Sequence, residues 1–176
     1  NMLQEPYNFT ENDFKNESSS NEEQHLYERG GLCPLEVNTE LKTYKTIKLL
    51  GEGAYSTVWE VSKGNNKYAI KISKANKDDE ETGQNEIKIL RKLGKNPYIL
   101  NLYDTFHYKS KNGKHLCMVI DNLGFDLHVL KRLFKYNNDS DTNSEVSNEE
   151  VVRGLPLNLS KKMIYQILKG LEHIHS

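Results

Sequence analysis

The sequence predicts an α+β fold: a five-stranded antiparallel sheet with one helix between its third and fourth strands, followed by two more helices. Short segments in the middle of the chain alternate apolar and polar residues, which is the period of half-buried strands. Tight-turn residues separate the first three of these segments, so they are expected to pair as an antiparallel meander. Towards the end of the chain, apolar residues recur every three or four positions, which is the period of an amphipathic helix.

The three strands of the meander are residues 44–50 (YKTIKLL), 57–61 (TVWEV) and 67–72 (KYAIKI). The glycine-rich segment 51–56 (GEGAYS) turns the chain between the first two strands. The dipeptide Asn65-Asn66, which follows a glycine, is the expected turn between the second and third strands, because asparagine tolerates the backbone angles of tight turns.

The helix inside the sheet is expected over residues 79–93, and Pro97 is expected to end it. Acidic residues occupy its first turns and basic residues its last, which suits the helix dipole. Gly83 should weaken the start of this helix by roughly 1 kcal/mol. Its apolar face is formed by Ile87, Leu90 and Leu93.

Two further strands and two helices complete the predicted architecture. The strands lie near residues 99–107 and 116–121 and are joined by the hydrophilic turn KSKNGK. The helices are residues 127–136 and 159–175. The apolar face of the last helix is formed by Ile164, Ile167, Leu168 and Leu171, at three- and four-residue spacing.

The composition excludes several classes of protein. Among 176 residues, 24 Lys and Arg stand against 25 Asp and Glu, so nucleic acid or an anionic membrane is not expected as a direct partner of the whole chain. No apolar stretch reaches about eighteen residues, and the N-terminus lacks the features of a signal peptide. Cys33 and Cys117 are too few for a disulfide framework or a zinc cluster, which favours a reducing compartment.

The charges are unevenly distributed along the chain. Residues 1–29 carry seven acids and two bases with few aliphatic side chains, so they are expected to form a disordered tail. Residues 137–150 (NNDSDTNSEVSNEE) carry five acids and no base, and are expected to form an exposed inserted loop. The remainder has a net charge of about +9. This excess indicates either a lysine-rich solvated surface or a surface suited to an anionic ligand.

The segment Gly51–Val58 (GEGAYSTV) lies between two predicted strands. A glycine-rich hairpin lets backbone N–H groups approach a triphosphate without interference from Cβ atoms, and Val58 can cover a flat base. The alternative is an ordinary hairpin turn, because the third glycine of such a loop is replaced by Ser56. A Rossmann fingerprint is excluded, since a strand rather than a helix follows the loop.

Lys71 and Glu86 make nucleotide binding the stronger interpretation. Lys71 lies on the third strand, one hairpin beyond the glycine-rich loop, where its ammonium group can reach α- and β-phosphates. Glu86 lies fifteen residues later on the predicted helix and can hold that ammonium group if it turns inward. Taken separately, a strand lysine and a helix glutamate are more often solvated surface residues.

From about Tyr44 to its end, the chain resembles a eukaryotic protein kinase: the small lobe followed by the first helices of the large lobe. The resemblance implies ATP and Mg²⁺ as cofactors. It also implies that Lys71 binds the phosphates and that Glu86 is the partner of Lys71 on helix αC. These two are the catalytic residues that the resemblance implies within the chain. The residues implied in nucleotide binding are Leu50, Gly51, Glu52, Gly53, Ala54, Tyr55, Ser56, Val58, Ala69, Lys71, Ile120, Asp121 and Leu123.

The same resemblance implies how the base of the nucleotide is bound. Val58 and Ala69 match the residues that contact adenine, and Ile120 matches the gatekeeper at the end of the strand that enters the hinge. Backbone groups of Asp121 and Leu123 match the hinge groups that bond adenine. Asp126, which follows Gly-Phe, aligns with a residue near the ribose hydroxyls.

Shorter segments resemble one subfamily, the SR-protein kinases. Residues 27–35 (YERGGLCPL) look like its Y-x-x-G-G-x-x-P sequence ahead of the small lobe. Residues 56–59 (STVW), 115–119 (HLCMV) and 154–157 (GLPL) also resemble its motifs. Another kinase of the CMGC group is the alternative. The resemblance implies phosphorylation of serines in Arg/Ser-rich splicing factors by the complete protein, in cytoplasm and nucleus.

The implied organisation has three parts: an acidic tail (1–29), a kinase small lobe (30–123), and the start of the large lobe (124–176) with helix αD, the acidic insert and helix αE. The 176 residues contain no H-x-D aspartate, no following asparagine and no D-F-G aspartate, so no metal ligand is assigned. The chain by itself is therefore expected to be inactive, with an uncovered apolar face on its last helix. The alternatives are a non-catalytic kinase module that binds a protein partner and a degenerate nucleotide-binding remnant.

Overall fold

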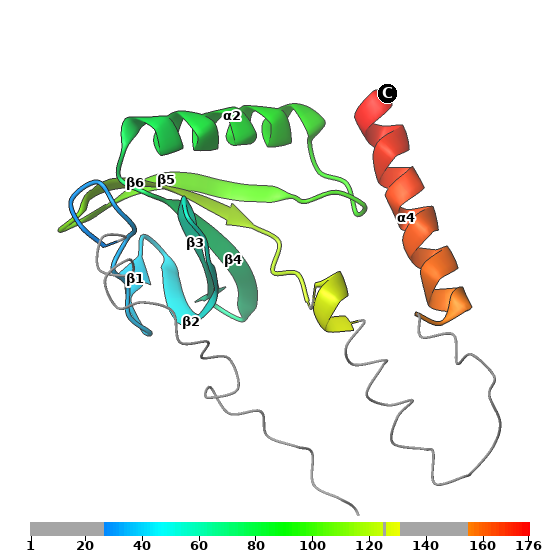
Figure 1. Ribbon diagram of the computed structural model, residues 1–176, viewed down its shortest axis with the longest axis horizontal. Coiled ribbons are helices and arrows are strands. Elements are labelled where there is room, and N and C mark those ends of the chain that lie inside the picture. Colours follow the sequence, from blue (N-terminus) through cyan, green and yellow to red (C-terminus); the bar gives the residue numbers. More distant parts are fainter. Residues whose placement is uncertain (1–26, 125, 131–154) are drawn as a thin grey trace, which may run out of the picture.

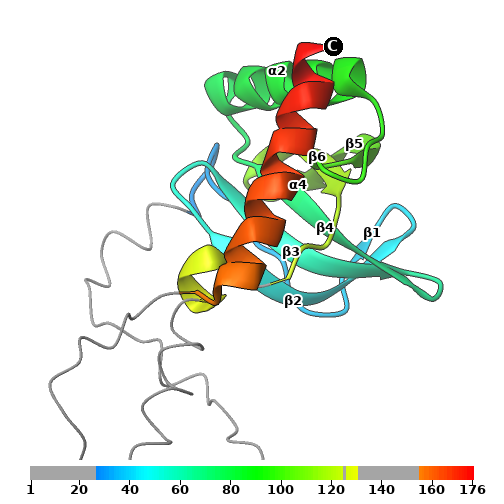
Figure 2. The same cartoon turned by 90° about the vertical axis from the view of Figure 1, so that its right-hand side faces the viewer.

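A computed structural model describes residues 27–124, 126–130 and 155–176. Figure 1 shows an antiparallel sheet with helix α2 along one face, and Figures 1 and 2 place helix α4 at the side away from strand β1. The predicted α+β fold is confirmed. Most of the predicted acidic tail, all of the insert 137–150 and most of the predicted helix 127–136 lie outside the described residues. No helix in the described part of the chain is both long and apolar enough to cross a membrane.

The sheet has six strands rather than the five predicted. In spatial order it runs β1-β2-β3-β4-β6-β5, and every neighbouring pair is antiparallel. The strands are β1 Glu40–Leu41, β2 Tyr44–Glu52, β3 Ser56–Lys63, β4 Asn66–Ser73, β5 Leu102–Ser110 and β6 Gly113–Ile120. The additional strand, β1, escaped prediction because two residues cannot display a period-two pattern. It pairs with the start of β2 through a tight turn in which Lys42 has a φ of 60°.

Several predicted strand boundaries were wrong: β2, β3 and β5 end two or three residues later than predicted, and β6 begins at Gly113 rather than near residue 116. The β3–β4 turn is Gly64-Asn65, with Gly64 at a φ of 59°, and Asn66 already pairs with Lys63 as the first residue of β4. Strand β5 begins at Leu102 rather than near residue 99. The preceding Asn101 bonds the carbonyl oxygens of residues 96 and 99 through its side chain, and such local bonds compete with strand pairing.

Helix α2 spans Lys77–Leu93, two residues longer at its start than predicted. Acids occupy its first turn and bases its last, as expected. The helix ends at Gly94, which has a φ of 69° and donates its N–H to the carbonyl of Leu90 at 3.1 Å. The prediction that Pro97 ends the helix was therefore wrong: a glycine C-cap stops it three residues earlier.

Asn76 caps the start of α2, because its side-chain oxygen accepts a hydrogen bond from the backbone N–H of Asp79 at 2.9 Å. We expect Asn76→Ala to lower the free energy of unfolding by about 1 kcal/mol, since an N–H group at the helix start then loses its partner. Urea unfolding followed by circular dichroism measures this change. Asn85→Ala, on the exposed face of the same helix, is the matched control and should not destabilise the protein.

Buried apolar residues form two clusters, one on each face of the sheet. Alternation along β4 sends Ile70 and Ile72 into the larger cluster and Ala69 into the smaller one. The smaller cluster also contains Ile87 of α2, so α2 covers the sheet face that carries Ala69. The other face is covered by the chain ahead of β2, including Cys33 and Leu41.

Cys33 and Cys117 are both buried and unpaired. Burial raises the pKa of the Cys33 thiol to about 11 and that of the Cys117 thiol to about 12. Both thiols are therefore neutral around neutral pH, and neutral thiols are poor nucleophiles. We expect neither to be alkylated by iodoacetamide in the folded chain at about pH 8, where free thiolate would react. Mass spectrometry should show both modified once urea unfolds the chain, and rapid labelling of the folded chain would contradict the prediction.

Helix α4 spans Leu157–His175, and its apolar face is exposed, as predicted. The exposed fractions of Ile164, Ile167 and Leu168 are 58%, 60% and 59%. Its one buried residue is Gly170, where a Cβ atom would lie 2.9 Å from a backbone oxygen of the loop before β5. Helix α4 therefore packs closely, at Gly170, against the loop that joins α2 to β5.

Candidate functional site

The glycine-rich hairpin joins β2 to β3, as predicted, but it is narrower than the sequence indicated. Gly51 and Glu52 still belong to β2, so only Gly53–Tyr55 connect the strands. The N–H of Gly53 donates to the carbonyl of Ser56 at 2.9 Å and closes the turn. Tyr55 is 71% exposed at the tip, and Ala54 lies beside it. The Glu52 carboxylate accepts a hydrogen bond from the Tyr27 hydroxyl, which ties the hairpin to the chain ahead of the sheet.

Lys71 on β4 and Glu86 on α2 are in contact. The Nζ atom of Lys71 lies 2.7 Å from Oε2 of Glu86, and the two side chains are 32% and 34% exposed. Lys71 stands directly across from Val58 of β3 in the strand register, next to the glycine-rich hairpin. The two residues that the sequence analysis paired are thus brought together from positions fifteen residues apart.

A cavity of about 270 Å³ lies where the hairpin, β4 and α2 meet. Its lining residues are Tyr55, Ser56, Lys71, Ser73, Asp79, Thr82, Gly83 and Glu86. Gly83 lines it because α2 approaches the sheet closely there: a Cβ atom would meet Cδ2 of Leu116 at 2.8 Å and Oγ of Ser73 at 3.2 Å. The sequence analysis treated Gly83 only as a weak helix former and missed its role in packing.

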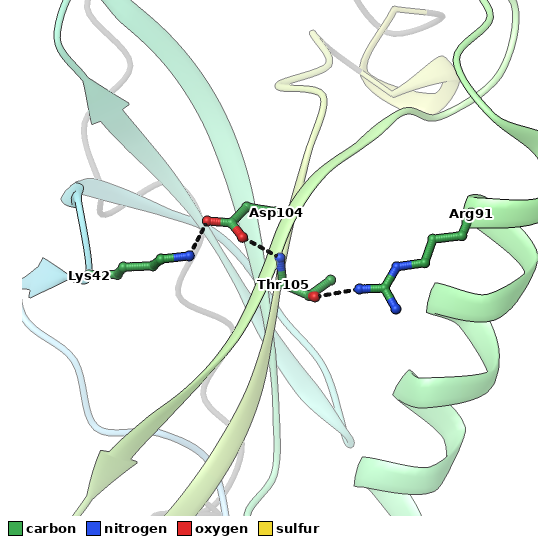
Figure 3. Close-up of polar contacts among 4 residues, drawn as sticks. All are labelled: Lys42, Arg91, Asp104 and Thr105. Atoms are coloured by element: carbon green, nitrogen blue, oxygen red, sulfur yellow. Dashed lines mark hydrogen bonds and ion pairs between the residues drawn. The ribbon is translucent and has the colours of Figure 1, made fainter.

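Contacts at both ends of α2 hold the helix against β5. Towards its start, Nε2 of His107 bonds Oε1 of Glu80 at 2.7 Å. Near its end, Arg91 donates to the hydroxyl of Thr105 at 2.8 Å (Figure 3). Glu86 lies between these two contacts, so both of them help to keep its carboxylate beside β4.

Strand β5 is itself fixed on its opposite side. Figure 3 shows Asp104 between Lys42 and Thr105: Lys42 bonds its carboxylate at 2.7 Å, and the backbone N–H of Thr105 does so at 2.8 Å. Burial opposes ionisation of Asp104, but these bonds outweigh it and lower its pKa. A break in the β5–β6 register between Leu102 and Asp104 accompanies this arrangement. Two neighbouring residues of β5 therefore bind different elements: Asp104 binds Lys42 of the β1–β2 turn, and Thr105 binds Arg91 of α2.

Three residues implied in base binding lie in one apolar area. Ala69 pairs with Ile120 across β4 and β6, and both are buried, with exposed fractions of 3% and 9%. Val58 of β3 packs against the same cluster. The flanking residues are open to solvent, since Leu50 is 42% and Leu123 is 69% exposed. A flat apolar ligand is suited to such a surface.

The chain leaves the sheet at Asp121, whose side chain is fully engaged. Its carboxylate accepts hydrogen bonds from the backbone N–H of Asn101 at 2.8 Å, from the Asn101 side chain at 2.9 Å and from the Tyr103 hydroxyl at 2.6 Å. Burial raises its pKa, but these bonds have the larger total effect and lower it. The carboxylate of Asp126 accepts from the N–H of Val129 at 2.7 Å, so it caps a helical turn.

The comparisons with known proteins agree with this geometry. Residues 44–176 match the family described as "Protein kinase domain". The chain belongs to the protein kinase family.

Relatives of this kinase chain include proteins named SRPK and SRSF protein kinase. It is 32% identical over 159 residues to the serine/threonine-protein kinase SRPK of Physarum polycephalum, over 85% of the chain and 34% of that relative. It is 30% identical over 161 residues to protein kinase dsk1 of Schizosaccharomyces pombe, and this match covers 85% of the chain and 26% of that relative. It is 31% identical over 160 residues to SRSF protein kinase 3 of Homo sapiens, and this match covers 85% of the chain and 25% of that relative. The predicted similarity to SR-protein kinases is confirmed. The chain spans about a quarter to a third of the length of these relatives.

Within the described part of this kinase chain, no group of three or more His, Cys, Asp or Glu side chains is arranged to hold a metal ion. Among the residues that line the cavity, the only acidic ones are Asp79 and Glu86, and both belong to α2. Lys71 is the one cation in that lining, so an anionic group placed there would meet Lys71 first.

Proposed function

We propose that this chain is the ATP-binding N-terminal part of a serine/threonine kinase of SR-protein-kinase type. The complete protein would phosphorylate serines of Arg/Ser-rich splicing factors, in cytoplasm and nucleus. The observation that supports this most strongly is the ion pair between Lys71 and Glu86, 2.7 Å apart beside the glycine-rich hairpin. A lysine held in this way can bind the α- and β-phosphates of ATP.

The residues of the site fit ATP. The apolar area of Val58, Ala69 and Ile120 suits the adenine ring, and backbone groups of Asp121 and Leu123 would bond its edge. Gly51 and Gly53 carry no Cβ atom, so the phosphates can come close to the backbone there. When bound, ATP supplies the phosphoryl group that is transferred.

Lys71 and Glu86 act on this nucleotide by charge and position. Lys71 would neutralise part of the charge on the phosphates and hold them in place, while Glu86 keeps the ammonium group from turning into solvent. The Mg²⁺ ligands and the base that this family uses belong to the D-F-G and H-x-D segments, which residues 1–176 do not contain. We therefore propose that residues 1–176 bind and orient the nucleotide, and that they do not transfer phosphate by themselves.

A non-catalytic module that binds a protein partner is the second candidate. The exposed apolar face of α4 favours it, because such a face requires some cover. The Lys71–Glu86 pair weighs against it, because a module without catalysis has no physical need for a lysine held beside a glycine-rich hairpin. The kinase proposal therefore accounts for more of the structure.

The test begins with the transcript that encodes Ser176. We expect its reading frame to continue into an H-x-D-x-K-x-x-N loop, and its full-length product to transfer phosphate from ATP to an Arg/Ser peptide but not to an Arg/Ala peptide. A stop codon directly after Ser176 in authentic transcripts would favour the non-catalytic module. Phosphate transfer by purified residues 1–176 would contradict the role given to the absent loop.

A further inference from the structure

Asn112, in the turn between β5 and β6, is a buried polar residue that the proposed function leaves unexplained. It is 5% exposed. Its Nδ2 atom donates two hydrogen bonds, each 2.7 Å long, to the backbone carbonyls of Tyr27 and Leu32. Its own carbonyl accepts the N–H of Gly30 at 2.7 Å. One residue of the turn therefore binds three positions of the segment 27–32 ahead of the sheet, here called the N-terminal clasp (Figure 1).

The clasp also binds the short link that joins β4 to α2. The carbonyl of Gly31 accepts the N–H of Ala75 at 3.0 Å. The carbonyl of Gly30 accepts from the side chain of Asn76, the N-cap of α2, at 3.5 Å. Gly30 has a φ of 84°, a left-handed conformation that is unfavourable for residues with a Cβ atom. A glycine at this position therefore lets the clasp turn its carbonyls towards the start of α2.

The β5–β6 turn and the glycine-rich hairpin hold the same link from other sides. A Cβ atom on Gly113 would lie 2.8 Å from Cβ of Ala75, so the turn and the link are in close contact. The N–H of Lys74 donates to the carbonyl of Tyr55 at 3.0 Å, which ties the link to the hairpin. Residues 74–76 are therefore fixed by the clasp, the turn and the hairpin together.

The link connects the two partners of the Lys71–Glu86 ion pair. Lys71 lies on β4, four residues before Ala75, and Glu86 lies on α2, eleven residues after it. Both side chains of the pair are about one-third exposed, so solvent weakens the pair and it contributes little to holding the helix. The position of Glu86 thus depends on the contacts that fix the backbone between the two residues.

We propose that Asn112 is a positioning residue: it fastens the clasp over the link, and the clasp sets the start of α2 so that Glu86 reaches Lys71. A side-chain amide suits this role, because both of its N–H donors can be directed at backbone carbonyls. In the part that concerns phosphate transfer, this inference rests on the proposed kinase function. The ordering of the link does not depend on that function.

The clasp is tested first without nucleotide, by amide hydrogen exchange in the 176-residue chain, monitored by NMR. The reporter is the N–H of Ala75, which donates to Gly31. We expect Asn112→Ala to accelerate its exchange roughly 10- to 100-fold, because two buried carbonyls lose their donor. Asn112→Asp keeps the size of the side chain but at neutral pH has no N–H or O–H to donate, so it should act like Asn112→Ala. Unaltered exchange in Asn112→Asp would overturn the clasp, because the side chain would then only fill space.

Gly30→Ala tests the clasp from its own side and leaves the Asn112 side chain in place. The added Cβ atom would lie 4.0 Å from the carbonyl oxygen of Ala75, which is ordinary contact, so the change acts through the φ of 84°. We expect exchange at Ala75 to accelerate roughly five- to tenfold. Gly64→Ala is the matched control, since Gly64 has a φ of 59° and lies in the β3–β4 turn with open space around it.

Asn101→Ala is the matched control for Asn112→Ala. The Asn101 side chain also donates to two backbone carbonyls, in the loop before β5, and to the Asp121 carboxylate. Its loss removes at least as many hydrogen bonds, but away from the clasp, and should leave exchange at Ala75 unchanged. Unchanged exchange in both clasp variants, or equal acceleration in the two controls, would overturn the clasp.

The consequence for phosphate transfer is tested in the full-length product. Asn112→Ala is expected to lower kcat for an Arg/Ser peptide roughly 10- to 100-fold, because fewer molecules hold Glu86 beside Lys71. In a Glu86→Ala background the same substitution should have no further effect, since no carboxylate is left to position. Effects that multiply in the double variant would overturn the catalytic part of the proposal. If the unaltered product does not use ATP while exchange at Ala75 responds as described, the proposed function fails and the clasp stands.

Discussion

Replacing Lys71 by methionine is expected to lower the phosphorylation of an Arg/Ser peptide by the full-length product roughly 100- to 1,000-fold. Methionine retains much of the apolar stem of lysine and removes the ammonium group that lies 2.7 Å from Glu86. Losses of this size follow when a positioned charge that stabilises the transferring group is removed. The measurement is kcat/KM for ATP at saturating peptide.

Stability distinguishes this effect from misfolding. Both side chains of the Lys71–Glu86 pair are about one-third exposed, so solvent weakens the pair and its loss should change the free energy of unfolding by less than about 1 kcal/mol. Lys45→Met, on the exposed side of β2, is the matched control and should retain full activity. Undiminished turnover in Lys71→Met would remove Lys71 from its proposed role.

Replacing Gly83 by valine is expected to destabilise the fold by about 1–3 kcal/mol, the usual result of forcing extra atoms into a packed interface. Even a single Cβ atom would lie 2.8 Å from Cδ2 of Leu116, which is buried. Relief requires either the buried Leu116 side chain to shift or α2 to move away from the sheet, and movement of α2 would separate Glu86 from Lys71. Activity should therefore fall together with stability, as measured by urea unfolding and peptide phosphorylation.

The matched control is Glu81→Val, which places the same side chain two residues earlier on the exposed side of α2. Shortening the opposing residue provides a second check: Leu116→Ala in the Gly83→Val background should recover part of the lost stability, because the valine then fills the space that is released. If Gly83→Val is as stable and as active as Glu81→Val, α2 does not depend on this close approach.

Local patterns predicted the strands and helices because burial on one face leaves a periodic trace. Strand β4 alternates between two buried clusters, and this alternation is visible in residues 67–72. The boundaries of strands and helices were less accurate, because the side chain of Asn101 before β5 and the glycine cap of α2 act on single residues that periodicity does not reveal. The two-residue strand β1 has no period at all.

Candidate site residues were predictable where a motif carries them. Lys71 and Glu86 stand at motif positions, and the structure brings them within 2.7 Å; their roles with ATP remain predictions. The supporting residues were missed. Asn101 and Tyr103 beside Asp121, and Arg91 on Thr105, are ordinary polar residues in the sequence, and only their partners distinguish them.

The sequence by itself determined the α+β class and the order of the main elements, because periodicity is a property of the chain alone, and its motifs carried the resemblance to protein kinases. Tertiary structure decided why Gly83 must be small and why Glu60 can be buried. Each depends on an atom from another element: Cδ2 of Leu116 on β6 faces Gly83 of α2, and Nζ of Lys67 on β4 lies 2.7 Å from Oε1 of the buried Glu60 on β3. Steric exclusion and the pairing of a buried charge act through space, so neither leaves a periodic trace along the chain.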